Sequence, residues 1–129
     1  MEIQSVKKHR GWIRIFQDAL SGIVYAFTSQ RNFKIHFSIS LLVIVLAFWL
    51  EVPFDNFLFL IFAIVFGLVV EVANTSFEKT VDLITEKYNE RARVVKDLSA
   101  GMMLLTSIGM ALIGFLILFP PLINKVLGL

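Results

Sequence analysis

The sequence predicts an all-α integral membrane protein with three transmembrane helices and an amphipathic surface helix near its amino terminus. The first observation is composition: 57% of the 129 residues are hydrophobic and the mean hydropathy is +0.80, outside the usual range of soluble domains. The second is that three apolar stretches approach the ~20 residues needed to span a bilayer. Because no linker separates these stretches, we expect residues 1–129 to form a single domain.

The surface helix is predicted at about residues 11–29. Apolar residues such as Trp12, Phe16 and Leu20 occupy one half of a 3.6-residue helical wheel. The other half carries Arg14, Gln17, Asp18, Ser21, Tyr25 and Thr28. Polar residues interrupt the segment too often for a signal peptide or a span, so we expect it to lie along the membrane surface.

The three spans are predicted at about residues 35–50, 54–75 and 98–119. We expect the second helix to continue to about residue 84 as an amphipathic extension, because Glu78 and Asp82 prolong a polar side while Val81 prolongs an apolar one. Pro120 and Pro121 are expected to end the third helix, since proline lacks the N–H that a helix interior uses.

The basic residues predict the orientation in the membrane. Eleven of the twelve lie before the first span or between the second and the third: Lys7, Lys8, Arg10, Arg14, Arg31, Lys34, Lys79, Lys87, Arg91, Arg93 and Lys96. Cytoplasmic segments carry an excess of Lys and Arg. We therefore expect a cytoplasmic amino terminus and an external carboxyl terminus.

Several classes of function are excluded or disfavoured. The absence of cysteine excludes a disulfide framework, a thiol nucleophile and a sulfur-based metal site. A net charge of only +2 argues against a nucleic-acid partner. The sequence contains neither a glycine-rich P-loop nor the protein-kinase motifs, so any nucleotide site must be of another kind.

A polar stripe runs along the second span. Glu71, Asn74, Glu78 and Asp82 are spaced by three, four and four residues, which places them on one helical face. A carboxylate in hydrocarbon is costly and marks a functional site, so Glu71 should face a protein interior or a water-filled site. For Asp82 and for Glu86, a simple solvated position at the interface is the alternative.

Together with Lys96 and Asp97, this stripe supplies three kinds of chemistry. Carboxylates can hold Mg²⁺ through phosphate oxygens and water, a carboxylate can remove a hydroxyl proton, and a lysine can neutralise a phosphate. Glu71 and Glu78 lie ~10 Å apart along the axis, which leaves room for a substrate between them. Alternatively, Lys96 and Asp97 could simply cap the third helix.

Three segments resemble a known family, and the first two carry its signature. The first two are Glu71-Val72-Ala73-Asn74-Thr75-Ser76-Phe77-Glu78 with Asp82, and Lys96-Asp97-Leu98-Ser99-Ala100-Gly101. Both resemble the signature of the prokaryotic diacylglycerol kinase and undecaprenol kinase family, and Arg31-Asn32-Phe33-Lys34-Ile35-His36 resembles the undecaprenol kinase branch. The resemblance covers about residues 11–119.

This resemblance implies a homotrimer in the bacterial inner membrane, with active sites between protomers, that transfers the γ-phosphoryl group of MgATP to a membrane lipid alcohol. Glu71 would be the catalytic base and Asn74 would position the reacting groups. The metal would lie at Glu78 and at the position of Gln30. The nucleotide would contact Asp18, Gln30, Glu78, Glu86, Asn89, Lys96 and Asp97. The lipid would contact Glu71, Asn32, Lys34 and Ser21.

The chain departs from the family pattern at two positions. Gln30 stands where the family usually has a metal-binding glutamate, and it keeps a carbonyl oxygen but loses the charge, so weaker Mg²⁺ binding is expected. Asn89 stands where many relatives have histidine. The sequence does not separate diacylglycerol from undecaprenol as acceptor.

A non-enzymatic protein of the same fold is the alternative function, either a cation-binding transporter subunit or a scaffold. A transport path should continue polar residues across the bilayer, yet the external halves of all three spans are almost purely apolar. The acids cluster on one side only. This distribution favours chemistry at the cytoplasmic interface.

Overall fold

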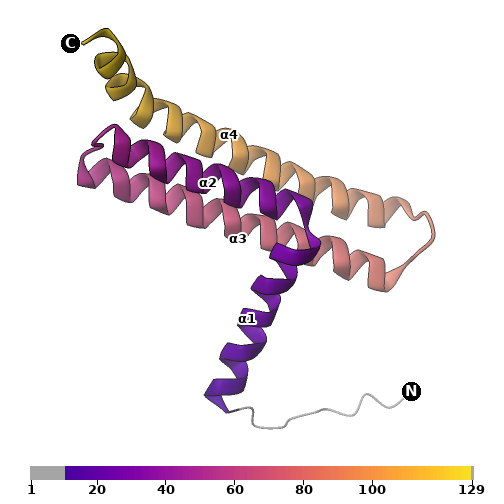
Figure 1. Cartoon of the computed structure of the whole chain (residues 1–129). Helices are drawn as coiled ribbons and strands as arrows, with labels where there is room; N and C mark the ends of the chain where they lie inside the picture. The colour runs from indigo at the N-terminus through magenta and orange to yellow at the C-terminus, as the bar shows by residue number, and fades with distance from the viewer. Residues whose placement is uncertain (1–10, 129) are drawn as a thin grey trace.

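The computed structural model describes residues 11–128, which form four α-helices. They are α1 (Trp12–Ser29), α2 (Arg31–Trp49), α3 (Phe54–Ile84) and α4 (Glu90–Leu127). Helices α2, α3 and α4 lie side by side in a bundle, and α1 projects from it at a steep angle (Figure 1). Residues 11–128 contain no strand, which confirms the all-helical prediction for this range. The predicted topology residues Lys7, Lys8 and Arg10 lie outside it.

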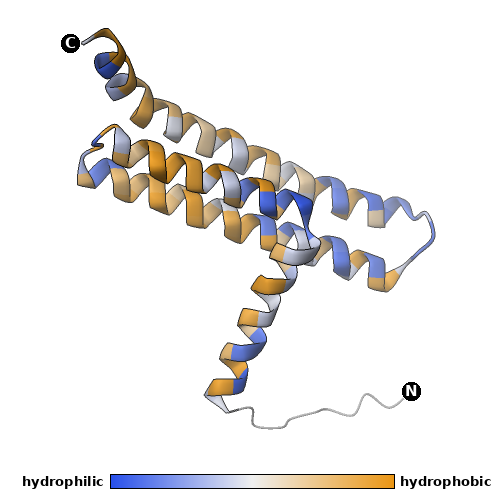
Figure 2. Ribbon diagram, viewed as in Figure 1, coloured by the Kyte–Doolittle hydropathy of each residue, from blue (hydrophilic) through white to orange (hydrophobic). Residues whose placement is uncertain are grey.

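Three helices are long and apolar enough to cross a membrane, as predicted: α2 with 19 residues, α3 with 31 and α4 with 38. At 1.5 Å per residue, α2 is ~29 Å long and matches a hydrocarbon core of ~30 Å, whereas α3 is ~46 Å and α4 ~57 Å. Helices α3 and α4 are therefore longer than a bilayer core is thick. Polar residues gather where these two helices run on past the start of α2 (Figure 2).

Helix α3 is the central element, because it packs against both α2 and α4. A buried apolar cluster of Ala47, Leu50, Leu60 and Leu118 joins the three helices near the turn between α2 and α3. Further along α3, a Cβ atom at Gly67 would meet the sulfur of Met110. The missing side chain of Gly67 thus allows α3 and α4 to approach closely.

The expectation that Pro120 and Pro121 end the last helix is wrong, because α4 continues to Leu127. These prolines lack the N–H groups that would bond to the carbonyls of residues 116 and 117, but this loss affects only one turn. Contacts beyond the prolines hold the final turns: Leu122 packs on the apolar cluster, and the Lys125 ammonium donates to the Trp49 carbonyl at 2.5 Å. The final turns of α4 bend away from the preceding axis (Figure 1).

Helix α1 is attached to the bundle by its carboxyl end. Phe27 makes edge-to-face contacts with Phe33 and Phe37 of α2, at ring-centroid distances of 6.3 and 5.3 Å. Gln30 ends α1 and precedes α2 in an extended conformation that sets the angle between them. Apolar side chains of the earlier turns, such as Trp12 and Phe16, are exposed. That this helix lies on a membrane surface stays a prediction.

Candidate functional site

The most unusual buried group is the carboxyl group of Glu71 on α3. This side chain is only 2% exposed, and its Oε2 atom has no hydrogen-bond partner. His36 of α2 and Glu78 are near enough to interact with it electrostatically. Leaving a buried polar atom unpaired costs about 1–3 kcal/mol, so such an atom needs an explanation. Glu71 is able to accept a hydrogen bond that this chain does not supply.

Asn74 lies one turn beyond Glu71 and is fixed from both sides. The Ser99 hydroxyl of α4 donates to Asn74 Oδ1 at 2.6 Å, in a fully buried contact. The Asn74 amide in turn donates to Glu78 Oε1 at 3.4 Å. Helix α4 therefore orients a polar chain on α3 through Ser99, a residue that the sequence reasoning gave no role. Its only signal was its place three residues after Lys96 in the family-like segment.

Lys96 and Asp97 lie close to the α3–α4 connection, but both form ion pairs there. Lys96 Nζ is 2.7 Å from Asp82 Oδ1, and Asp97 Oδ2 is 2.7 Å from Arg93 Nη1. The sequence predicts only a topology role for Arg93, although its spacing of four residues from Asp97 is typical of a helical ion pair.

The alternative interpretation, that Lys96 and Asp97 cap the last helix, is wrong. Helix α4 begins at Glu90, so these residues lie in its second turn. The cap is Asn89, whose Oδ1 accepts from the backbone N–H groups of Arg91 at 2.9 Å and Ala92 at 3.2 Å. An asparagine oxygen satisfies the free donors of the first turn in this way.

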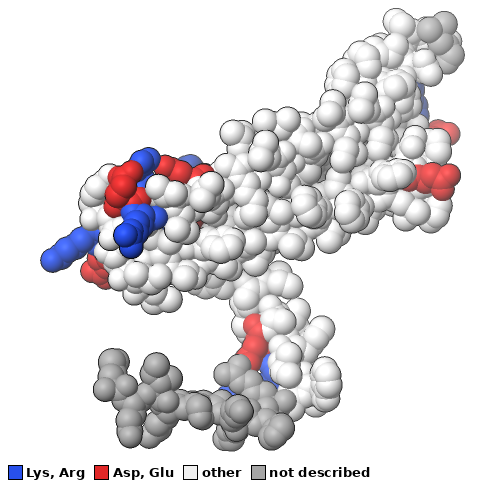
Figure 3. Space-filling view, turned by 180° about the vertical axis from the view of Figure 1, so that it is seen from behind, with Lys and Arg blue, Asp and Glu red and all other residues white. Residues whose placement is uncertain are grey.

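A polar pocket of about 470 Å³ surrounds the connection between α3 and α4. It gathers four predicted nucleotide-binding residues, Glu86, Asn89, Lys96 and Asp97. The remaining lining residues are Val81, Asp82, Thr85, Lys87, Tyr88, Ala92 and Arg93. Acidic and basic side chains gather at this end of the bundle (Figure 3).

The other predicted site residues lie elsewhere in the protomer. Asp18 and Ser21 are on α1, which projects from the bundle, and the Ser21 hydroxyl donates to the Gln17 carbonyl within that helix (Figure 1). Gln30 lies at the α1–α2 junction and donates to Ser29 at 3.3 Å. Asn32 and Lys34 are exposed in the first turns of α2.

The donor set suits a cation only if the substrate supplies further ligands. Among residues 11–128, no three His, Asp or Glu side chains converge on a metal site. Mg²⁺ usually binds through one or two carboxylates together with phosphate oxygens and water. Glu78 fits that pattern, because Asn74 occupies only one of its carboxylate oxygens.

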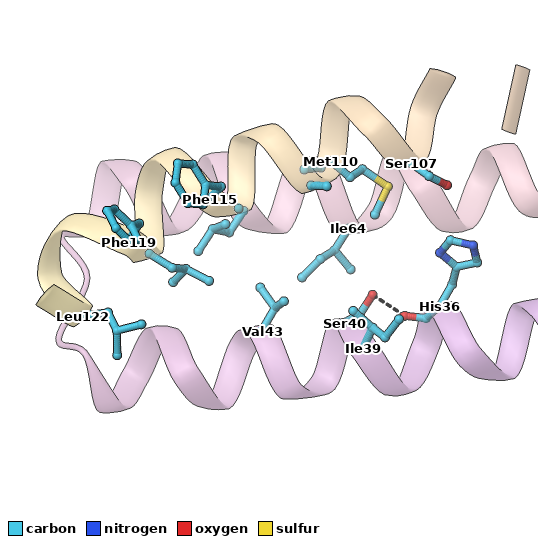
Figure 4. Close-up of a pocket in the computed structure, with 15 residues that line it drawn as sticks. His36, Ile39, Ser40, Val43, Ile64, Ser107, Met110, Phe115, Phe119 and Leu122 are labelled. Atoms are coloured by element: carbon cyan, nitrogen blue, oxygen red, sulfur yellow. Dashed lines mark hydrogen bonds between the residues drawn. The ribbon is translucent and has the colours of Figure 1, made fainter. Parts of the chain in front are cut away.

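An apolar groove of about 460 Å³ opens between α2 and α4. Its polar residues, His36, Ser40 and Ser107, gather at one end, and the His36 ring points into the groove (Figure 4). Apolar side chains including Val43, Ile64, Phe115, Phe119 and Leu122 line the rest (Figure 4). Ile64 lies seven residues before Glu71, which places the groove on the face of α3 that carries the carboxyl group.

Comparison with known proteins identifies the family of this chain. The family profile described as prokaryotic diacylglycerol kinase matches residues 17–118, a range that contains every predicted site residue. The chain is 36% identical over 110 residues to a diacylglycerol kinase of Synechocystis sp., covering 84% of this chain and 63% of that protein. It is 32% identical over 121 residues to the undecaprenol kinase of Bacillus subtilis, covering 90% and 98%. Identity to the diacylglycerol kinase of Escherichia coli is 30% over 101 residues, covering 76% and 83%. The chain thus spans less than two thirds of the Synechocystis relative.

Proposed function

This chain belongs to the prokaryotic diacylglycerol kinase family, and we propose from this premise that it is an ATP- and Mg²⁺-dependent lipid kinase. It transfers the γ-phosphoryl group of ATP to the hydroxyl group of a membrane lipid alcohol, diacylglycerol or undecaprenol. The reaction would take place at the cytoplasmic face of the bacterial inner membrane, and the distribution of basic residues supports a cytoplasmic position for the polar end of the bundle.

The observation that carries this proposal is the buried, unpaired Oε2 atom of Glu71. A lipid hydroxyl would supply the missing donor. As the proton passes to Glu71, the hydroxyl oxygen attacks the γ-phosphorus; a new O–P bond forms, and the bond to the bridging oxygen of ADP breaks. Asn74, fixed by Ser99, would hold the reacting groups in line with the carboxylate.

Lys96 and Glu78 would act on the polyphosphate. The Lys96 ammonium lies beside Asp82 at the polar pocket and would neutralise charge on the transferred phosphate. Glu78 would bind Mg²⁺ with its free oxygen, and Gln30 could contribute a carbonyl oxygen. When bound, the ion would offset the charge on the β- and γ-phosphate oxygens.

We further propose that the active enzyme is a homotrimer with sites between protomers. One protomer leaves α1 projecting and its apolar side chains exposed, so the predicted residues Asp18, Ser21 and Gln30 do not complete its own acidic stripe. Covering that stripe with α1 of a neighbour would bring these residues to Glu71 and Glu78. Together with Arg14, they would then line a closed site. An active, strictly monomeric preparation would contradict the arrangement.

The groove between α2 and α4 would accept the apolar chain of the acceptor. Its polar end contains His36, which is near enough to Glu71 to interact with it electrostatically, and the groove extends away from this end between apolar side chains. An acceptor seated there would present its hydroxyl to the carboxyl group, close to Asn32 and Lys34 at the start of α2.

The test is phosphoryl transfer from radiolabelled ATP with Mg²⁺ into undecaprenol, diacylglycerol and sphingoid bases, using the purified full-length protein. A labelled lipid that is absent with Glu71→Gln would support the kinase and identify its acceptor. If the wild type forms no product but Gln30→Glu does, the loss of a metal-binding carboxylate has silenced the site. No product with either protein would favour the non-enzymatic alternative.

A further inference from the structure

The carboxyl group of Glu71 is enclosed by its own helix as well as by its neighbours. Its side chain is only 2% exposed, and Val70, Asn74 and Thr75 of α3 are also buried. If Glu71 takes the proton of the acceptor hydroxyl, each turnover leaves it as a neutral carboxylic acid with almost no contact with water. The next turnover requires the carboxylate again, so the proton must leave through a neighbouring group.

The polar chain along α3 does not offer such a route. Asn74 lies between Glu71 and Glu78, and its amide group does not titrate. Its oxygen accepts from the Ser99 hydroxyl at 2.6 Å, and its nitrogen donates to Glu78 Oε1 at 3.4 Å. Glu78 lies ~10 Å from Glu71 along the helix axis, beyond the ~3 Å reach of a direct proton transfer. The proton therefore needs a partner on another helix.

His36 of α2 meets this requirement. It interacts electrostatically with Glu71 across the α2–α3 interface. Its side chain is half-buried, and the ring points into the apolar groove at the polar end (Figure 4). Ser107 and the other groove residues of α4 carry no charge. Histidine is the side chain that most readily both accepts and releases a proton near neutral pH.

The His36 ring is unbonded and lies near the polar end of its helix. The His36 carbonyl accepts from the Ser40 hydroxyl at 2.8 Å, but among residues 11–128 no group forms a hydrogen bond with the ring nitrogens. His36 lies five residues after Arg31, the first residue of α2, a distance of ~8 Å along the axis. These first turns are hydrophilic, and Arg31 and Lys34 are exposed (Figure 2). The ring thus lies between the buried carboxyl group and the polar surface of the bundle.

We propose that His36 accepts the proton from Glu71 after each phosphoryl transfer and passes it to water. The inference rests on the proposed kinase function, because that reaction delivers the proton to Glu71. The O–H bond of the carboxylic acid breaks as an N–H bond forms on the imidazole, and the imidazolium then releases the proton to water. No reactant other than water is needed, and nothing is oxidised or reduced. His36 acts through Glu71 and restores the carboxylate for the next acceptor.

The test compares the first turnover with later turnovers in full-length His36→Gln. Glutamine keeps a polar side chain but does not take up a proton. The first phosphorylated lipid per site should form at a rate within about twofold of the wild type, whereas later turnovers should be at least about tenfold slower because Glu71 stays protonated. Quenched-flow measurements with radiolabelled ATP resolve the two phases. His9→Gln, at the only other histidine in the sequence, should behave as the wild type in both.

Added imidazole separates proton transfer from a packing role of His36. In His36→Ala, imidazole can enter the space left by the ring and should raise the steady-state rate at least about threefold, while changing the wild-type rate less than about twofold. Equal slowing of first and later turnovers in His36→Gln, or no response of His36→Ala to imidazole, would overturn the inference and leave the kinase function intact. No lipid phosphorylation by the wild type would overturn both.

Discussion

The two ends of the helical bundle treat their polar groups in opposite ways. The Trp49 end comprises Trp49, Glu51 and Lys125, and the acidic end comprises Glu71, Asn74 and Glu78. At the Trp49 end, the Lys125 ammonium donates to the Trp49 carbonyl, lies 4.9 Å from the Trp49 ring centroid and stands 3.6 Å from Glu51 Oε1. The apolar cluster of Ala47, Leu50, Leu60 and Leu118 lies beneath these contacts.

At the acidic end, a buried carboxyl oxygen of Glu71 has no partner, although Ser99 and Asn74 are fully engaged nearby. Proteins rarely keep an unsatisfied polar atom in a packed interior unless it serves a purpose. We therefore expect the Trp49 end to contribute stability and the acidic end to sacrifice stability for binding. Variants that remove a polar group at either end test this division, because they should change stability and activity differently.

The largest effect is expected from Glu71→Met, which replaces the carboxyl group with an apolar side chain of similar length. Turnover should fall at least about 1,000-fold, because the proposed proton acceptor is lost. The free energy of unfolding should nevertheless rise by about 1 kcal/mol, because an unpaired buried polar atom disappears. Kinase assays and thermal unfolding in the same detergent measure both quantities. A variant that is inactive and also destabilised would show that Glu71 contributes to the fold instead.

The next effect is expected from Ser99→Ala, which removes the buried hydrogen bond to Asn74. The Asn74 oxygen loses its partner, so the free energy of unfolding should fall by about 1–3 kcal/mol. The kcat should fall about tenfold. Ser40→Ala is the matched control for stability, since Ser40 is 6% exposed against 5% for Ser99 but donates to the His36 carbonyl of its own helix. That carbonyl keeps its helical partner, so Ser40→Ala should cost less. Equal losses would mean that Asn74 does not depend on Ser99.

A smaller effect, on substrate binding, is expected from filling the apolar groove between α2 and α4. A Cβ atom at Gly114 meets no other atom within 4 Å, so Gly114→Leu should fill the groove without straining the helices. The KM for a long-chain acceptor should rise about tenfold, the ratio that corresponds to ~1.4 kcal/mol of lost contact. Gly109→Leu is the control, because Gly109 has equal space but lines a different pocket. Similar KM values for both variants would place the acceptor elsewhere.

The sequence predicted the parts of this molecule that depend on local pattern. Helical periodicity and the length of apolar runs are enough to predict three spans, and the spacing of Glu71, Asn74 and Glu78 is enough to place them on one face. The end of α4 was mispredicted because Pro120 and Pro121 were judged by local propensity alone. The contact of Lys125 with Trp49 at the end of α2, 76 residues away in the sequence, overrides that propensity.

The partners of the site residues were less predictable. Ser99 and Asn74 are separated by 25 residues, and their hydrogen bond depends on the register between α3 and α4, which no local pattern reports. The pairing of Lys96 with Asp82 depends on the same register. For Tyr88, the sequence shows an aromatic residue in a polar connection, but only the fold shows that its hydroxyl donates to Glu90.

The smallest effect is expected at the Trp49 end, where Lys125→Met removes the contacts to Trp49 and Glu51. These contacts are partly exposed to solvent, so the free energy of unfolding should fall by only about 1 kcal/mol. The kcat of the folded fraction should not change, because Lys125 touches no residue of the acidic end. Lys79→Met, at an exposed lysine of α3, should shift stability by less than about 0.5 kcal/mol. A lower kcat in a fully folded preparation of Lys125→Met would show that the two ends are coupled through α4. The division between a stabilising end and a binding end would then be wrong.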